Sequence, residues 1–196
     1  MRIESLSSLQ TYQDCPRAYA YKYHEGLKPP LERYRFRMGM FVDRLLSTML
    51  ELEQSSLSTL QIQALWGELR DIPWEDHFLL VEGDWIRAID VAHRAIKFIH
   101  SLQWETFKLD GKLCVQTELH REGLRGIIDW IAQDKKGNLC LVDFKVVQTK
   151  QDPKAQLMFD KQLSFYAWLL RDKVGERPIH MYQIRVLGKA PTTPKK

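Results

Sequence analysis

The fold is decided by residues 126–145, which read GIIDWIAQDKKGNLCLVDFK. Two runs of apolar and β-branched residues flank the polar stretch DKKG at 134–137, a pattern typical of two antiparallel strands joined by a tight turn. If the turn is symmetric about Lys136, Asp129 lies directly opposite Asp143. Lys145 then shares the face of Asp143, because side chains alternate along a strand. The stretch therefore predicts two carboxylates and an ammonium group on one face of a sheet.

A second hairpin precedes the first, with its turn at Glu122-Gly123. We expect strands at 112–121, 124–133 and 138–147, a register that places Gln116 opposite Asp129 and puts Glu118 on the same face. Both faces of this sheet are apolar, so we expect helices on both. Strict alternation assigns Ile127, Ile131, Leu139 and Leu141 to the charged face, and Ile128, Trp130, Ala132, Cys140, Val142 and Phe144 to the other.

The rest of the chain has mainly helical periodicity. Helices are predicted at 5–23, with an interruption at Cys15-Pro16, and at 35–52, 57–69, 84–107 and 154–171, followed by a strand at 179–186. This order predicts a mixed α/β fold, with a mixed central β-sheet flanked by helices and a helical N-terminal region. We expect one domain over 1–187, with 1–110 mainly helical and 111–187 forming the sheet and its helix, and a disordered basic tail over 188–196.

Composition narrows the class of protein. Among the 196 residues, 44% are hydrophobic and 28% are charged, which is ordinary for a globular protein and excludes a disordered or fibrous chain. No apolar run approaches the roughly 18 residues that span a bilayer, so we expect no membrane association and a cytoplasmic location. The formal charge is +4, and both chain ends are basic around an acidic segment at 46–90. Basic regions with interleaved aromatics favour a polyanionic partner, in the first place DNA.

Two opposed carboxylates on a covered sheet face are costly, because like charges repel and buried charges lose hydration. A hard divalent cation would offset this cost. Mg²⁺ binds one or two carboxylates, keeps several waters and leaves room for a phosphate oxygen. In the alternative interpretation, Asp143 and Lys145 form an ion pair at the end of the sheet and Asp129 is solvated.

These residues resemble a known family. Asp129 followed by Asp143-Phe144-Lys145 resembles the D…(D/E)-x-K core of the PD-(D/E)XK nuclease superfamily. Two further patterns resemble the RecB-like branch, which includes recombination nucleases and phage exonucleases. They are the N-terminal motif Ser7-x-Leu9-x-x-Tyr12-x-x-Cys15-Pro16-Arg17-x-Tyr19 and the later Gln162-x-x-x-Tyr166. The resemblance covers 5–45 and 112–170.

The resemblance implies a restriction-endonuclease-like core and a set of residue roles. Asp129 and Asp143 would bind Mg²⁺ or Mn²⁺, and Lys145 would assist hydrolysis. Gln162 and Tyr166 would contact DNA near the scissile phosphate, although Tyr166 can equally be read as an aromatic core residue. Glu118 is a candidate further ligand, or an exposed glutamate at a strand end.

The chain departs from the RecB-like pattern at two positions. Where that branch has a metal-binding histidine four residues after a glycine, this sequence has Asp43 after Gly39. A carboxylate suits Mg²⁺, so Asp43 is a candidate ligand, but the replacement could equally mark a weakened site. Iron–sulfur members use four cysteines, whereas this chain has no cysteine after Cys140. We therefore expect no iron–sulfur cluster, and we expect Cys15 to be a small core residue.

The resulting functional hypothesis is a Mg²⁺-dependent DNA nuclease of exonuclease type, acting in recombination, repair or phage DNA processing in a bacterial or phage-infected cell. Its partners would be a single strand or a duplex end, and a recombination or single-strand-annealing protein. Two alternatives stay open: a catalytically weak module that binds DNA ends on the same fold, and an endonuclease. Residues that could line a DNA path, or simply be solvated, are Arg17, Tyr19, Arg33, Arg35 and Arg37.

Overall fold

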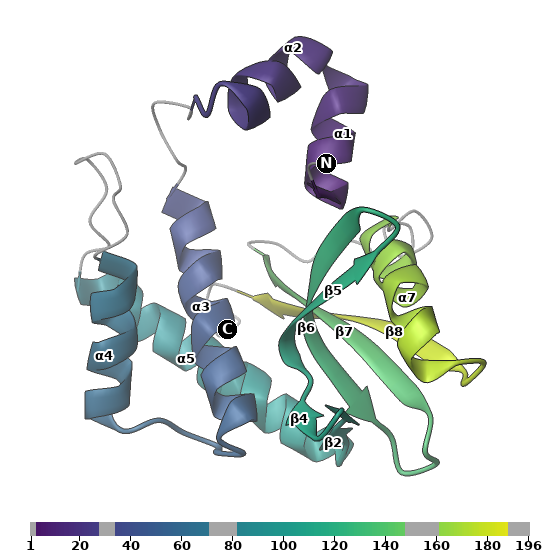
Figure 1. The fold of residues 1–196 in the computed structure, drawn as a ribbon. Coiled ribbons are helices and arrows are strands. Elements are labelled where there is room, and N and C mark those ends of the chain that lie inside the picture. The colour runs from purple at the N-terminus through teal and green to yellow at the C-terminus, as the bar shows by residue number, and fades with distance from the viewer. Residues whose placement is uncertain (1–2, 28–33, 71–81, 148–160, 188–196) are drawn as a thin grey trace, which may run out of the picture.

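The computed structural model describes residues 3–27, 34–70, 82–147 and 161–187 (Figure 1). Its helices are α1 (Leu6–Asp14), α2 (Pro16–Tyr19), the π-helical turn η1 (Ala20–His24), α3 (Tyr34–Glu51), α4 (Thr59–Arg70), α5 (Glu82–Leu102) and α7 (Lys161–Val174). Its strands are β1 (Glu4–Ser5), β2 (Glu105–Thr106), β3 (Lys108–Leu109), β4 (Lys112–Leu113), β5 (Val115–Arg121), β6 (Leu124–Gln133), β7 (Leu139–Val147) and β8 (Ile179–Leu187). In Figure 1, α3, α4 and α5 lie on one side of the sheet and α7 on the other. The predicted mixed α/β fold is confirmed.

Strand β6 is the centre of a six-stranded mixed sheet. Along one edge it pairs antiparallel with β5 and β2. Along the other edge it pairs with β7 from Trp130 to Gln133, and with the short parallel strand β1 at Leu124 and Arg125. Between these two contacts, over 126–129, no strand covers that edge among the described residues. Strand β7 continues beside β8 in parallel up to Val147, so β6 and β7 separate at this point.

Both predicted hairpin registers are confirmed wherever the strands pair, but the predicted pairs of Asp129 with Asp143 and with Gln116 are not part of the ladders. Trp130 pairs with Val142 in one hairpin and with Val115 in the other, as symmetric turns require. The predicted assignment of faces is wrong on one side of Asp129. Ile128 packs against α7 together with Ile131, while Trp130 packs toward α3 and α5. Ile128 and Trp130 are two residues apart and should share a face, but they lie on opposite faces of the sheet.

A local backbone distortion explains this change of faces. Opposite Asp129, Gln116 has a φ of 45°, in the left-handed region that strands avoid. The ladder between β5 and β6 accordingly skips from Thr117 to Val115. One residue on each strand, Gln116 and Asp129, is left out of the ladder while the register on both sides is kept, so both strands change faces at the same point.

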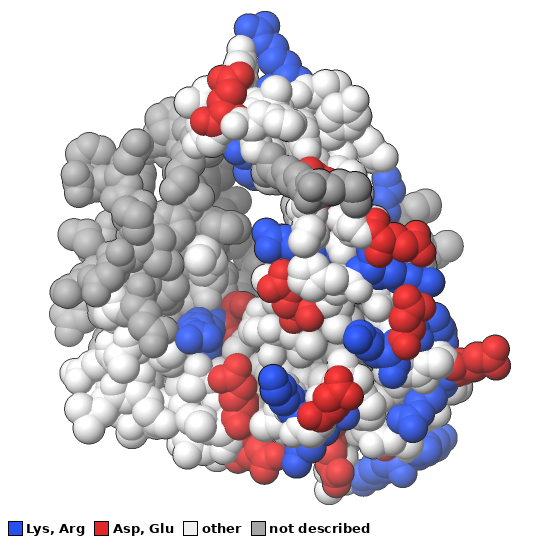
Figure 2. Space-filling view, viewed as in Figure 1, with Lys and Arg blue, Asp and Glu red and all other residues white. Residues whose placement is uncertain are grey.

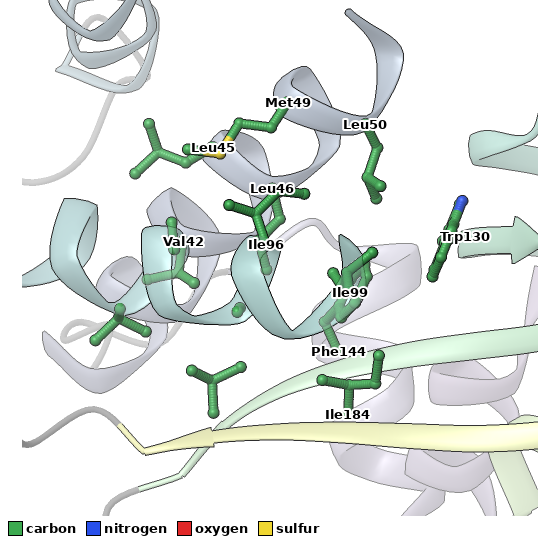
Figure 3. Close-up of a cluster of buried hydrophobic side chains, with 14 of the residues drawn as sticks. Val42, Leu45, Leu46, Met49, Leu50, Ile96, Ile99, Trp130, Phe144 and Ile184 are labelled. Carbon is green, nitrogen blue, oxygen red and sulfur yellow. The ribbon is translucent and has the colours of Figure 1, made fainter. Parts of the chain in front are cut away.

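Two apolar cores lie on the two faces of the sheet. The larger one packs α3, α4 and α5 against the sheet (Figure 3), and the side chains labelled there include Leu45, Leu46, Met49, Ile96, Ile99, Trp130 and Phe144. The smaller one packs α7 onto the opposite face through Ile128, Ile131, Leu141, Leu163, Leu169 and Leu170. Each such side chain contributes roughly 1.5–3 kcal/mol by leaving water. The two cores fix α3 and α7 on opposite sides of the point where β6 and β7 separate.

The ends of several helices follow from local chemistry. α1 begins with a capping box, in which Ser5 accepts from the Ser8 amide and Ser8 accepts from the Ser5 amide. α5 ends at Leu102, earlier than the predicted 107, because Gln103 turns the chain at a φ of 56° and 105–106 pairs with β6. The prediction that Cys15 is a core residue is wrong: Cys15 is exposed, and its sulfur caps α2 by accepting from the Ala18 amide.

Two predictions concern residues that the structure does not describe. The tail 188–196 and the first part of the predicted helix 154–171 lie outside the described residues. Within the described ranges, no helix combines the length and apolar character that a membrane span needs.

Candidate active site

Three carboxylates meet where β6 and β7 separate. Asp129 comes from β6, Asp143 from β7 and Asp43 from the middle of α3, and all three line one pocket of about 310 Å³. Lys145 and Gln162 complete its polar lining. The sheet and the two helices that cover its faces thus deliver charged groups to one point.

Asp129 spans the gap between the diverging strands. Its Oδ2 accepts a hydrogen bond of 2.8 Å from the backbone N–H of Phe144 on β7. Burial, followed by the charge of Asp43, raises the pKa of Asp129 to about 7, although the Phe144 N–H acts in the opposite direction. The ammonium group of Lys145 also lowers the pKa of Asp129, but burial and the two neighbouring carboxylates outweigh it.

Asp143 is fully buried, and two donors hold its carboxylate. Lys145 Nζ donates to Oδ1 at 2.8 Å, and Gln183 Nε2 donates to Oδ2 at 3.3 Å. Gln183 is the direct neighbour of Asp143 in the parallel ladder of β7 and β8. The ion pair of the alternative interpretation therefore exists, but Asp129 is partly buried, and its carboxylate accepts from the backbone instead of being free in solvent.

Lys145 is held from two sides. Besides Asp143, its Nζ donates to Gln162 Oε1 at 3.1 Å, and Gln162 Nε2 donates to the Tyr166 hydroxyl at 2.8 Å. Tyr166 itself is buried in the core beneath α7. The side chain of Lys145 keeps 40% of its surface exposed, so its ammonium group remains accessible from the pocket.

Asp43 stands at the position where the RecB-like pattern has histidine. The Nε2 of Gln116 donates to both of its oxygens, at 3.2 and 3.0 Å. Burial, followed by the charge of Asp143, raises the pKa of Asp43 to about 6, against the opposing effect of Lys145, Arg44 and the Gln116 hydrogen bond. The unusual backbone of Gln116 thus directs an amide to a carboxylate on a distant helix.

The donor set fits a hard divalent cation. As the side chains lie, no three His, Cys, Asp or Glu groups within the described ranges are arranged to hold a metal. Mg²⁺, however, needs only one or two carboxylates and takes water and substrate oxygens for the rest. Burial and the neighbouring carboxylates disfavour the ionised forms of Asp43 and Asp129 and so raise the pKa of both groups, and a bound cation would offset both effects. Asp129 and Asp143 would hold the ion, with Asp43 beside them.

Other predicted residues lie elsewhere. Glu118 does not line the pocket; it pairs with Arg125 at 3.3 Å and with His120 at 3.2 Å. Arg17 is exposed, and its Nε donates to the Tyr21 hydroxyl at 2.7 Å. The Tyr19 hydroxyl donates to Glu4 at 2.7 Å. Arg33 and the side chains of Arg35 and Arg37 fall outside the described part of the chain.

Sequence reasoning missed Gln183. The stretch QIR at 183–185 runs beside DFK at 143–145, so that Gln183 pairs with Asp143 and Arg185 with Lys145. Alternating polar residues in the last strand were the available signal. Assigning them to the site required knowing that β8 lies parallel to β7, which no local pattern reveals.

The fold and this pocket define a class: an α/β protein whose central sheet and helix α3 bring three aspartates and a lysine to one pocket. Comparison with known families makes the assignment specific, since the family model described as PD-(D/E)XK nuclease superfamily matches residues 4–195. The chain belongs to the PD-(D/E)XK nuclease superfamily, whose members are nucleases that usually use divalent metals. A search of curated proteins found no match.

Proposed function

We propose that the protein is a Mg²⁺-dependent DNA nuclease of the RecB-like branch, acting as an exonuclease in recombination, repair or phage DNA processing. The observation that carries this proposal is the convergence of Asp129, Asp143 and Lys145 in one pocket, with Asp43 added from α3. The order of the N-terminal motif, the D…D-x-K core and Gln162-x-x-x-Tyr166 supports the assignment to the branch.

Each residue of the pocket has a distinct task in this proposal. Bound Mg²⁺ supplies Lewis acidity toward the phosphate and lowers the pKa of water. Lys145, held by Asp143 and Gln162, would donate a hydrogen bond to the phosphate oxygen on which charge develops. Because Asp143 is fully buried, water does not compete for its oxygens, and its carboxylate would hold the ammonium group of Lys145 in one orientation. Contact of Gln162 and Tyr166 with DNA remains a prediction.

One observation favours a second candidate, a catalytically weak module that binds DNA ends. Asp43 replaces the imidazole of the branch and adds a third negative charge to the pocket. If this charge repels the substrate phosphate more than it attracts a cation, the protein would bind DNA without efficient turnover. An endonuclease is a further alternative on the same pocket.

Degradation of end-labelled DNA separates these candidates. Linear single-stranded DNA, linear duplex and a closed circle would be incubated with Mg²⁺, Mn²⁺ or EDTA. We expect metal-dependent loss of the linear substrates and an intact circle. Lys145→Ala should lower the rate at least about 100-fold, as expected for loss of a group that stabilises the transition state. Lys136→Ala, in the exposed hairpin turn, is the matched control and should cleave like the wild type.

The remaining variant assigns the role of Asp43. If Asp43→Ala loses activity with Mg²⁺, the carboxylate serves as a ligand; if activity rises, it weakens the site. DNA binding without cleavage under any metal would refute the nuclease proposal and leave the binding module. Cleavage of the closed circle would instead establish an endonuclease.

A further inference from the structure

A second groove adjoins the active-site pocket. It measures about 580 Å³ and lies between α1, β6 and α7. Gln162 lines both cavities. The groove runs beside 126 and 127, where the edge of β6 carries no strand among the described residues, and Asp129 stands at the end of the same open edge. A chain lying in the groove would therefore lead directly to the carboxylates.

The wall formed by α1 is polar and firmly attached. Ser7, Gln10 and Gln13 face the groove at helical spacing. Parallel pairing of β1 with β6 anchors the start of α1, and the Glu4 amide donates to the Gly123 carbonyl at 3.1 Å. The hydroxyl and amide groups are thus presented from a fixed helix, and such groups commonly bind phosphate and sugar oxygens.

The opposite side supplies an aromatic ring and positive charge. Phe165 and Lys161 line the groove from α7, and Arg125 lines it from β6. Phe165 is partly buried and stacks on Trp168, with ring centroids 5.9 Å apart. The part of its ring that lines the groove offers a surface on which a base can stack. Arg125 forms an exposed ion pair with Glu118 at 3.3 Å, with both side chains about half exposed. A phosphate can compete for such a pair, because exposed ion pairs contribute little.

The rest of the surface gives no broad alternative on the side shown. In Figure 2, Lys and Arg side chains are interspersed with Asp and Glu over the described face. A mixed surface of this kind does not attract DNA strongly as a whole. Recognition therefore depends on local features, and the groove combines the cations Arg125 and Lys161, amide groups, an aromatic ring and the carboxylate of Asp14 beside the site.

The size of the groove selects the form of the ligand. A volume of about 580 Å³ lies within the range of pockets for small organic ligands, which is room for one or two nucleotides and not for a paired duplex. We propose that this groove binds one or two unpaired nucleotides adjacent to the scissile phosphate, so that the substrate must be single-stranded at the site. This inference rests on the proposed nuclease function for its meaning, but the binding can be tested separately.

The test measures binding without cleavage. All proteins would carry Lys145→Ala and be kept in EDTA, and their affinity for a fluorescent single-stranded oligonucleotide would be compared with that for a blunt-ended duplex of two separate strands, which has no unpaired loop. Phe165→Leu removes the ring but keeps an apolar side chain, and should weaken single-strand binding about tenfold. Arg125→Gln should weaken it and reduce its salt dependence by about one phosphate contact.

Phe98→Leu is the matched control, because Phe98 is an exposed ring on α5, away from the groove. It should bind like the parent protein. Thermal unfolding shows whether each variant is folded. If one of the two groove variants is not folded, the binding measured with the other one tests the proposal. Unchanged single-strand affinity in Phe165→Leu and Arg125→Gln, or equal affinity for the blunt duplex, would overturn the proposal.

The two proposals fail in different ways. A wild-type protein that never cleaves, but whose single-strand binding depends on Phe165 and Arg125, refutes the nuclease function and retains the groove. A protein that cleaves with Mg²⁺ while both variants bind normally retains the nuclease function and refutes the groove.

Discussion

Replacing Asp129 with asparagine should stabilise the metal-free protein at alkaline pH. Burial and the charge of Asp43 raise the pKa of Asp129 from 3.8 to about 7. Each pKa unit corresponds to about 1.4 kcal/mol, so the ionised group costs the folded state about 4 kcal/mol at pH 8. The asparagine side chain cannot ionise, and its oxygen can still accept from the Phe144 amide, as Asp129 does.

The sign follows from proton binding. Between 3.8 and about 7 the folded protein holds a proton on Asp129 that the unfolded chain has lost. The stability due to this proton is complete below 3.8 and is lost as the pH rises through about 7. The advantage of Asp129→Asn should therefore shrink to about 2 kcal/mol at pH 5.

Urea denaturation in EDTA at pH 5 and pH 8 measures this difference. Asp110→Asn removes an exposed carboxylate at a left-handed turn position that asparagine also adopts, and it should leave the free energy of unfolding nearly unchanged at both pH values. Equal stability of Asp129→Asn and the wild type at pH 8, or a gain that does not depend on pH, would refute the electrostatic reasoning.

Three further outcomes are expected. Added Mg²⁺ should raise the melting temperature of the wild type measured by calorimetry, and it should raise that of Asp129→Asn much less; equal shifts would argue against Asp129 as a ligand. Gly126→Ala should lower the free energy of unfolding by about 1–3 kcal/mol in urea, because a Cβ would lie 2.7 Å from Leu169 Cδ1 and 2.8 Å from the Tyr166 ring. Ser5→Ala, which removes half of the capping box of α1, should cost about 1 kcal/mol in the same assay, and a wild-type value would show that β1 alone holds the helix.

The sequence allowed much of the sheet and part of the candidate site to be predicted. Turn residues and alternating apolar positions were enough for the two hairpin registers, because a turn constrains the strands on both of its sides. The prediction that Asp143 and Lys145 share a face is confirmed by their hydrogen bond of 2.8 Å. These relations are local, so local patterns contain them.

The parts that were missed depend on contacts between distant segments. Ile128 lies on the unexpected face because the backbone of Gln116 is left-handed. Neither isoleucine nor glutamine is a residue type that predicts this conformation. β1 consists of only Glu4 and Ser5 and exists through its pairing with β6. The hydrogen bonds of Asp43 come from a residue 73 positions away, which no spacing rule predicts.

The left-handed Gln116 also has a consequence for protein engineering. Its φ of 45° favours glycine, so Gln116→Gly would relieve backbone strain. The same substitution would delete the two hydrogen bonds to Asp43. A library selected only for heat resistance would enrich glycine here only if relief of strain outweighs the loss of these hydrogen bonds, whereas a library selected for DNA degradation should retain glutamine. Sequences recovered from the two selections would show whether stability and catalysis favour different residues at this position.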